Sequence, residues 1–263
     1  MPKPHSYSSL SMYERCPRQY AFRYIEKAEI PELPLDWRMH AGSVVHAALE
    51  FIYLKSSKNK KVELEKIVEE LQRKWDEAIA LSSVPVTPEE LLPFVQQSVK
   101  NVEYYYQHHF LPETEATLGV EHKVMLPLFP QRKQWLIGFL DRVSSPEESV
   151  ITIHDYKTGK QTLTNKTLLQ DFQATLYGGM AAHEFGKEMP LKKIELKWHY
   201  LSHEKTVSAI LTPDASRSAI QKAQNLSTRI GYSSQTGLFP AQEGAHCSYC
   251  DFSTICPAKK KSN

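Results

Sequence analysis

The sequence predicts a mixed α/β fold in which helices flank one central β-sheet. Apolar residues recur at helical spacing within residues 41–110, whereas apolar and polar residues alternate, as in strands, within residues 119–159. A further helix, two strands and a last helix follow. Because the strands do not alternate one by one with helices, this order predicts a mixed sheet rather than a parallel barrel.

The N-terminal part is expected to be helical. Residues 6–25 contain serine and glutamate residues suited to a helix start, and a capping box is expected at Ser11–Glu14. Pro17 should interrupt or restart this helix. Further helices are expected over residues 41–55, 62–81 and 89–110, with a loop at 82–87 and Pro88 in the first turn of the third.

The remainder of the chain supplies the sheet. Strands are expected over residues 119–128, 133–144, 149–159, 192–202 and 205–212, and helices over residues 165–185 and 214–234. The first of these helices should be capped by Thr164 or Asn165.

Composition places the chain among ordinary globular proteins. Hydrophobic residues make up 41% of its 263 residues, charged residues make up 24%, and the net charge is +2. No segment approaches the roughly 18 uninterrupted apolar residues of a membrane span, and the N-terminus has no signal-peptide core. We therefore expect a cytoplasmic protein without membrane contact. The basic run Lys259–Lys261 is expected to be a solvated end.

Two carboxylates and a lysine are expected to meet on the sheet. Asp141 lies in "GFLDRV", and Asp155 and Lys157 lie two residues apart in "HDYKTGK", on one face of the next strand. Two carboxylates this close favour a cation between them, and oxygen ligands suit Mg²⁺ or Mn²⁺. Such a metal can activate water and offset the charge of a phosphate.

The Asp-x-Lys pattern by itself is a weak signal, since most such pairs are solvated strand residues. Here Asp155 follows the apolar run "VITI", so it should lie at the end of a buried strand. The dipeptide "TG" then ends the strand at a place where loops and sites gather.

Three of the four cysteines lie within ten residues. Cys247 and Cys250 have the C-x-x-C spacing of a metal centre, and Cys256 follows. Cys16 is the only cysteine left for a fourth position, and proline follows both Cys16 and Cys256. An iron–sulfur cluster and a Cys₄ zinc site both fit, with His5 or His246 as substitute zinc ligands. A disulfide is disfavoured in a reducing cytoplasm.

Taken in order, six segments resemble the PD-(D/E)XK nucleases. They are "YSSLSMYERCPRQYAFRY", "GSVVHAALE", "GFLDRV", "HDYKTGK", "QATLY" and the cysteine-rich tail, which together span Tyr7 to Pro257. The resemblance is closest to the RecB-like branch with an iron–sulfur cluster, which includes the CRISPR-associated adaptation exonucleases and the AddB nuclease domain. It implies a restriction-endonuclease-like core in a single domain over residues 1–263, with a helical insert at about 51–112.

The resemblance also implies roles for individual residues. His46 would help hold the Mg²⁺ or Mn²⁺ ion with Asp141 and Asp155, and Lys157 would be the catalytic lysine. Without the resemblance, a lone histidine such as His46 on an apolar helix would be interpreted as an ordinary core or surface residue.

A second set of roles concerns the helix after the catalytic strand. Gln173 and Tyr177, four residues apart on one helix face, would contact DNA and buttress the site. Without the resemblance they would be read as solvated surface and core. Glu121 is similar to an acid often found in the first strand of the family, and no role is assigned to it.

For the cysteines, the resemblance implies that Cys16, Cys247, Cys250 and Cys256 hold a [4Fe–4S] cluster, with zinc as the rival occupant. Either centre would form a clasp, made of Cys16 and residues 247–256, that joins the two ends of the chain.

The function implied is a Mg²⁺- or Mn²⁺-dependent deoxyribonuclease, an exonuclease acting on single strands or free ends, with endonuclease activity also open. It would leave a 5′-phosphate and a 3′-hydroxyl in DNA repair, recombination or CRISPR adaptation. The alternative is a non-catalytic DNA-binding or adaptor subunit on the same fold, serving a helicase or an adaptation complex. A third interpretation is a zinc-clipped protein that only shares the fold.

Aromatic and histidine residues outside these motifs are given structural roles. Tyr104–Tyr106, Tyr20 and Tyr24 could stack on bases, but helix packing is the preferred interpretation. The ten histidines other than His46 are predicted to lie at the surface.

Overall fold

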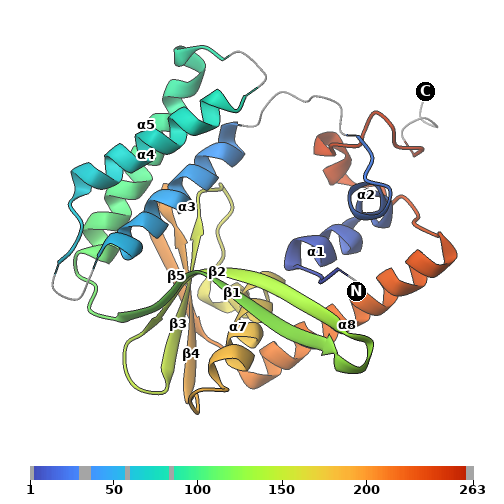
Figure 1. Ribbon diagram of the computed structural model, residues 1–263. Coiled ribbons are helices and arrows are strands. Elements are labelled where there is room, and N and C mark those ends of the chain that lie inside the picture. Colours follow the sequence, from blue (N-terminus) through green and yellow to red (C-terminus); the bar gives the residue numbers. More distant parts are fainter. Residues whose placement is uncertain (1–2, 30–36, 57–59, 83–85, 259–263) are drawn as a thin grey trace. The chain divides into compact units, whose positions relative to one another are not determined.

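The computed structural model describes residues 3–29, 37–56, 60–82 and 86–258 (Figure 1). The lysine run Lys259–Lys261 lies outside the described residues, as do residues 83–85 of the expected loop and residues 57–59 of the expected helical insert. Within the described part, no helix combines the length and apolar character that crossing a membrane requires.

The elements follow the predicted order of helices, three strands, helices, two strands and a final helix. The helices are α1 (Tyr7–Arg15), α2 (Pro17–Tyr20), α3 (Trp37–Lys55), α4 (Leu64–Ala80), α5 (Pro88–Tyr105), α6 (Asn165–Leu168), α7 (Phe172–Phe185) and α8 (Pro213–Thr236). The strands are β1 (Ala116–Phe129), β2 (Gln134–Ser145), β3 (Val150–Lys157), β4 (Lys193–Tyr200) and β5 (Lys205–Ile210). Short helical turns cover Ala21–Ile25, Tyr106–Phe110, Pro130–Arg132, Leu201–His203 and Ala245–Tyr249.

The five strands form one mixed sheet in the order β1-β2-β3-β4-β5. Strand β3 is antiparallel to β2 and parallel to β4, and β5 returns antiparallel to β4. A parallel pair needs a crossover connection, and the segment that carries α6 and α7 supplies it. The predicted mixed α/β fold is confirmed, and β3 has neighbours on both sides.

Helix ends in two places differ from the sequence-based expectation. The capping box of α1 is formed by Ser6 and Ser9, so the expected box at Ser11–Glu14 is wrong, because both residues lie inside the helix. The expected single helix over residues 165–185 is divided, because the Asp171 side chain caps a new helix by accepting a hydrogen bond from the Ala174 N–H at 2.8 Å. Pro17 does restart the N-terminal helix, as predicted: it is the first residue of α2.

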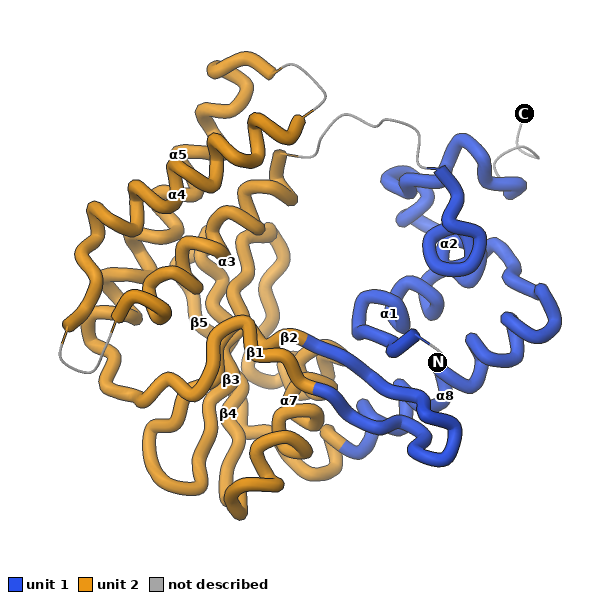
Figure 2. The backbone as a smooth tube through the Cα atoms, viewed as in Figure 1, with its two compact units in different colours: residues 1–34, 125–138, 217–263 blue, residues 35–124, 139–216 orange. Residues whose placement is uncertain are grey.

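The described chain divides into two compact units (Figure 2). Unit 1 comprises residues 1–34, 125–138 and 217–263, and unit 2 comprises residues 35–124 and 139–216. Unit 1 therefore joins segments from both ends of the chain. Unit 2 contains α3 to α5, most of the sheet and α7.

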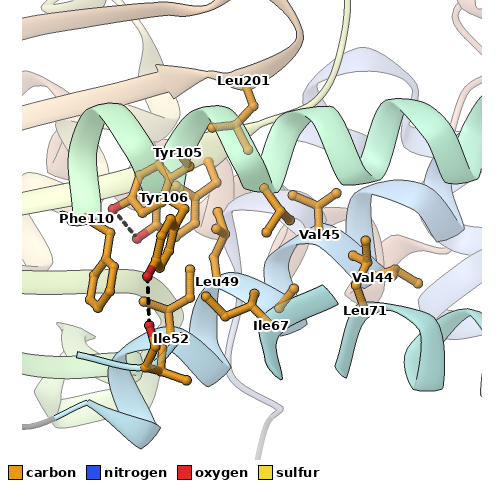
Figure 3. Close-up of a cluster of buried hydrophobic side chains, with 14 of the residues drawn as sticks. Val44, Val45, Leu49, Ile52, Ile67, Leu71, Tyr105, Tyr106, Phe110 and Leu201 are labelled. Carbon is orange, nitrogen blue, oxygen red and sulfur yellow. Dashed lines mark hydrogen bonds between the residues drawn. The ribbon is translucent and has the colours of Figure 1, made fainter. Parts of the chain in front are cut away.

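Unit 2 has a hydrophobic cluster where α3, α4 and α5 pack together (Figure 3). Leu49 and Ile52 of α3 are fully buried against α4 and α5, and Ile67 of α4 is equally buried. Tyr105 and Tyr106 also belong to this cluster, which confirms the packing interpretation for these two tyrosines. This cluster fixes α3, the helix that carries His46.

A buried polar network lies on the other side of β3 from Asp155. His154 and His199 are almost inaccessible, and their ring nitrogens are 3.0 Å apart. Their predicted surface position is therefore wrong, as it is for His5, which is also buried. Burial lowers the pKa of His154 to about 3 and the pKa of His199 well below its usual value, so both rings are neutral at neutral pH.

Two leucines of α3 provide a matched test of the core. Leu49→Ala should lower the free energy of unfolding by about 2–5 kcal/mol, because it leaves a cavity at a fully buried position. Leu54→Ala, on the same helix but 64% exposed, should change it by less than about 0.5 kcal/mol. Urea unfolding followed by circular dichroism measures both, and equal losses would contradict this account of the core.

Candidate active site

A carboxylate and an ammonium group are paired at the end of the buried strand β3. Asp155 is 4% exposed, and its Oδ2 lies 2.7 Å from Lys157 Nζ. The two side chains share a face of the strand because they are two residues apart. Asp155 Oδ2 is buried, and the Lys157 ammonium group contacts it from one side. A buried carboxylate oxygen of this kind has coordination capacity left for a cation.

Helix α7 holds Lys157 from the other side. Gln173 lies in the first turn of this helix, and its Oε1 accepts a hydrogen bond of 3.0 Å from Lys157 Nζ. Tyr177, one turn further on, makes a hydrogen bond with Gln173. Burial alone would lower the pKa of Lys157, but the charge and hydrogen bond of Asp155 raise it above its usual value. The lysine is therefore held as a cation with its ammonium group in a fixed position.

The backbone of Tyr156 aligns two more of the predicted residues. Its N–H donates a 2.7 Å hydrogen bond to Asp141 Oδ2, and its carbonyl accepts one of 2.8 Å from His46 Nε2. Because a carbonyl can only accept, His46 must carry its proton on Nε2 when neutral, which leaves a lone pair on Nδ1. That nitrogen lies 3.5 Å from Asp141 Oδ1.

Glu121 joins this pair to form a group of three candidate metal ligands. One ligand atom each from His46, Glu121 and Asp141 lies within 4.8 Å of the other two. The sequence alone assigns no role to Glu121, and the structure explains its position by a backbone distortion. Its φ is +44°, a conformation uncommon for a residue other than glycine, so β1 departs from regular alternation at this point. The only sequence signal was an acid in the first strand.

Asp155 lies outside that close group but is coupled to it by charge. Burial raises the pKa of Asp155 to about 7; the Lys157 charge opposes this shift, whereas Asp141 adds to it. Burial would lower the pKa of His46, but the hydrogen bond and charge of Asp141 raise it to about 9. Burial and the Asp141 charge also raise the pKa of Glu121. Carboxylates crowded in this way are stabilised by a divalent cation, and imidazole with oxygen ligands suits Mn²⁺ or Mg²⁺.

The site opens into two hollows in unit 2. A groove of about 600 Å³ is lined by His46 and Glu121 together with Arg38, Glu50 and Thr158. A second hollow of about 420 Å³ is lined by Lys157 and Gln173 and by the loop that follows β3. A substrate can therefore reach both the group of three ligands and the lysine.

The four cysteines surround one cavity in unit 1. Cys16, Cys247, Cys250 and Cys256 all line a hollow of about 290 Å³. The backbone N–H of Gln242 donates a 3.4 Å hydrogen bond to the buried Cys16 sulfur. Burial raises the pKa of the Cys250 thiol, and the nearby thiols of Cys16 and Cys256 add to this shift. The structure thus brings Cys16 to the three cysteines of the tail.

Contacts around this cavity connect the two ends of the chain. The backbone N–H of Arg18 donates to the Pro240 carbonyl at 3.2 Å, and Arg23 forms an ion pair with Asp251. The rings of Phe22 and Phe252 stack with their centroids 5.3 Å apart. The cysteines therefore lie within a packed region, and neither His5 nor His246 is part of any three-ligand group among the described residues.

Comparison with protein families decides the general class. The family model of the PD-(D/E)XK nuclease superfamily matches residues 4–257, which is nearly the whole chain. The chain belongs to the PD-(D/E)XK nuclease superfamily. The members of this superfamily usually use divalent metals, in keeping with the group formed by His46, Glu121 and Asp141. No curated protein is significantly similar to the chain in sequence.

Solved structures share the fold at low sequence identity. The crystal structure of a provisionally named exonuclease from Eubacterium rectale superimposes with a TM-score of 0.55 at 11% identity, over 99% of this chain and 88% of that one. A protein named SSO0001 gives a TM-score of 0.38 at 13% identity, over 83% of this chain and 85% of that one. The first of these supports the nuclease fold.

Glu121 can be tested as a metal ligand by comparison with Glu50, which lines the same groove outside the group of three. Glu121→Gln should weaken Mn²⁺ binding at least about tenfold, because even residues behind the ligands have effects of that size. Glu50→Gln should have a clearly smaller effect. Isothermal titration calorimetry measures both affinities, and equal weakening would show that only the overall negative charge of the groove matters.

Proposed function

We propose that this chain is a metal-dependent deoxyribonuclease that hydrolyses phosphodiester bonds at the site around Asp141, Asp155 and Lys157. The observation that carries the proposal is the buried Asp155–Lys157 pair next to the group of three metal-binding residues, in a member of a nuclease superfamily. Mg²⁺ or Mn²⁺ would be held by His46, Asp141 and Asp155, as the family resemblance implies, with Glu121 as an additional ligand.

The residues of the site have distinct roles in this proposal. The bound ion would activate a water molecule and offset negative charge on the phosphate. Lys157 would direct its ammonium group at the attacking water or at the charge that develops on the phosphate. Gln173 positions the lysine through its 3.0 Å hydrogen bond, and Tyr177 positions Gln173, so both support the site even where they do not reach DNA.

We further propose exonuclease activity on single strands or free ends, as in the sequence-based hypothesis. The structural neighbour that carries the name exonuclease supports this choice. The rival function, a non-catalytic DNA-binding or adaptor subunit, is disfavoured because each position of the active-site motif holds a functional residue. Partnership with a helicase or with CRISPR adaptation proteins, and a cytoplasmic location, stay predictions.

The nuclease proposal predicts strong losses from two substitutions. Asp155→Asn and Lys157→Met should each lower kcat/KM for single-stranded DNA at least about a hundredfold in Mn²⁺, since each removes a charged group from the site. Lys166→Met, at an exposed position of α6, should have no effect. Digestion of end-labelled oligonucleotides measures the rates. If the first two variants cut like wild type, the site assignment is wrong; if wild type binds DNA but never cuts it, the adaptor function is favoured.

We also propose that Cys16, Cys247, Cys250 and Cys256 hold a [4Fe–4S] cluster. All four thiols line one cavity, and a backbone N–H points at the Cys16 sulfur, as occurs around cluster ligands. A zinc ion would hold four sulfurs only about 3.8 Å apart, given Zn–S bonds of about 2.3 Å. No three of the described cysteine sulfurs lie within 4.8 Å of one another, and this wider separation favours the cluster over zinc.

The cluster proposal predicts both the metal content and the effect of a cysteine substitution. Protein purified without oxygen should contain equal amounts of iron and acid-labile sulfide, whereas a zinc site would contain zinc and no sulfide. Cys250→Ser should lose the iron and lower the melting temperature, because the tail is then no longer bound to Cys16. Ser248→Ala, in the same turn, should retain the iron. Zinc in the wild type and no sulfide would overturn the proposal.

A further inference from the structure

A third cavity of unit 2 lies beside the groove of the metal-binding group. It has a volume of about 660 Å³ and is lined by α3, by α5 and by the loops that follow β3 and β4. Arg38 and Thr158 line both this cavity and the groove that contains His46 and Glu121. The two hollows are therefore adjacent, and a ligand that fills one can extend into the other.

The lining of this cavity differs in charge from that of the groove. The groove contains Glu50 and Glu121, whereas none of the described residues that line the third cavity carries a carboxylate. Its charged side chains are Arg38 and Lys160. This composition favours the binding of a polyanion. The cavity adjoins the groove whose acids would hold the metal.

The walls also supply the groups that bind an unstacked base. Phe94 and Pro93 of α5 present an aromatic ring and an apolar surface, and the exposed Gln97 of the same helix presents an amide group. Aromatic rings bind unpaired bases of any sequence by stacking. The volume lies within the range of pockets that enclose small ligands, so the cavity has room for a base with its sugar.

Hydrogen bonds fix the cavity to the strand that carries the catalytic lysine. The Ser202 hydroxyl lies 3.1 Å from the carbonyl of Thr158, to which it donates, and Thr158 follows Lys157 directly. Asn101 Nδ2 donates to the same hydroxyl oxygen at 3.3 Å, and Gln97 Nε2 donates to Asn101 Oδ1 at 2.9 Å. Helix α5 therefore holds the loop after β3, and the cavity keeps a set position relative to Lys157.

We propose that this cavity binds an unpaired nucleotide of single-stranded DNA next to the phosphodiester bond that is cut. This inference rests on the proposed nuclease function and adds a strand-recognition site formed by the helical insert. A base can enter such a hollow only when it is neither paired nor stacked with its neighbours, so a continuous duplex is disfavoured. Arg38 and Lys160 would hold the flanking phosphates, and Phe94 would stack on the base.

Binding experiments with two variants test the site. The probe is a fluorescent oligodeoxythymidylate, titrated in Ca²⁺ so that it is not cleaved. Phe94→Ala should weaken binding about 5- to 100-fold, the size of one lost base–aromatic stack. Lys160→Ala should reduce the slope of log affinity against log salt by about one, as expected for one lost phosphate contact. A duplex of the same length should bind more weakly than the single strand.

Matched controls come from the same helix. Tyr104→Ala removes an aromatic ring of α5 outside the cavity lining, and Lys100→Ala removes an exposed lysine of α5; both should bind like wild type. Phe94 also packs against the core of unit 2, so its variant is compared with wild type by thermal melting. Lys160 is exposed, and its variant keeps the test decisive if Phe94→Ala unfolds.

A small substrate separates this inference from the nuclease proposal. Bis(p-nitrophenyl) phosphate carries no nucleobase and no flanking phosphate, so Phe94→Ala should hydrolyse it at the wild-type rate while kcat/KM for the oligonucleotide falls. If both variants bind and cut the oligonucleotide like wild type, or Phe94→Ala loses the two activities equally, the proposed nucleotide-binding cavity is wrong and the nuclease proposal stands. If wild type hydrolyses neither substrate in Mn²⁺, the nuclease proposal fails and the inference falls with it.

Discussion

The placement of Asp155 in the interior, at the end of the central strand β3, is the constraint on which the candidate site depends. A buried carboxylate is costly unless cations balance it, and Lys157 balances it at 2.7 Å. The neighbouring Tyr156 backbone then orients Asp141 and His46, one through its N–H and the other through its carbonyl. Strand β3 is held in place by neighbouring strands on both sides. Its backbone hydrogen bonds therefore hold Asp141 of β2 and His46 of α3 in defined positions.

The face of β3 opposite Asp155 shows how unit 2 accommodates polar groups in its interior. His154 and His199 satisfy each other at 3.0 Å, and Ser144 lies 2.8 Å from the other nitrogen of His154. Arg142, with no exposed surface, is paired with Glu113 and bonded to the Tyr53 hydroxyl. Buried polar groups are tolerated when they are hydrogen-bonded, and such a network also restricts the packing to one arrangement. Strand β3 is therefore fixed on both faces.

Unit 1 is stabilised mainly by contacts between segments that are far apart in the sequence. Its segments come from both ends of the chain and from the β1–β2 turn, so a small number of strong contacts must offset the entropy of closing long loops. The Arg23–Asp251 ion pair and the stacked rings of Phe22 and Phe252 supply part of this stabilisation. A metal centre on four cysteines would supply the strongest link, because a bound metal contributes its binding energy to folding.

The sequence by itself determined the element order, the mixed sheet and the Asp155–Lys157 pair, because these follow from local periodicity and from residues two positions apart. It also placed Asp141 on an adjacent strand. Only the tertiary structure decided the position of Glu121 beside His46 and Asp141, since it lies where β1 has a positive φ, and periodicity cannot reveal such a distortion. The same holds for the buried pair His154 and His199, because burial of a polar side chain depends on partners distant in sequence, and no local pattern identifies them.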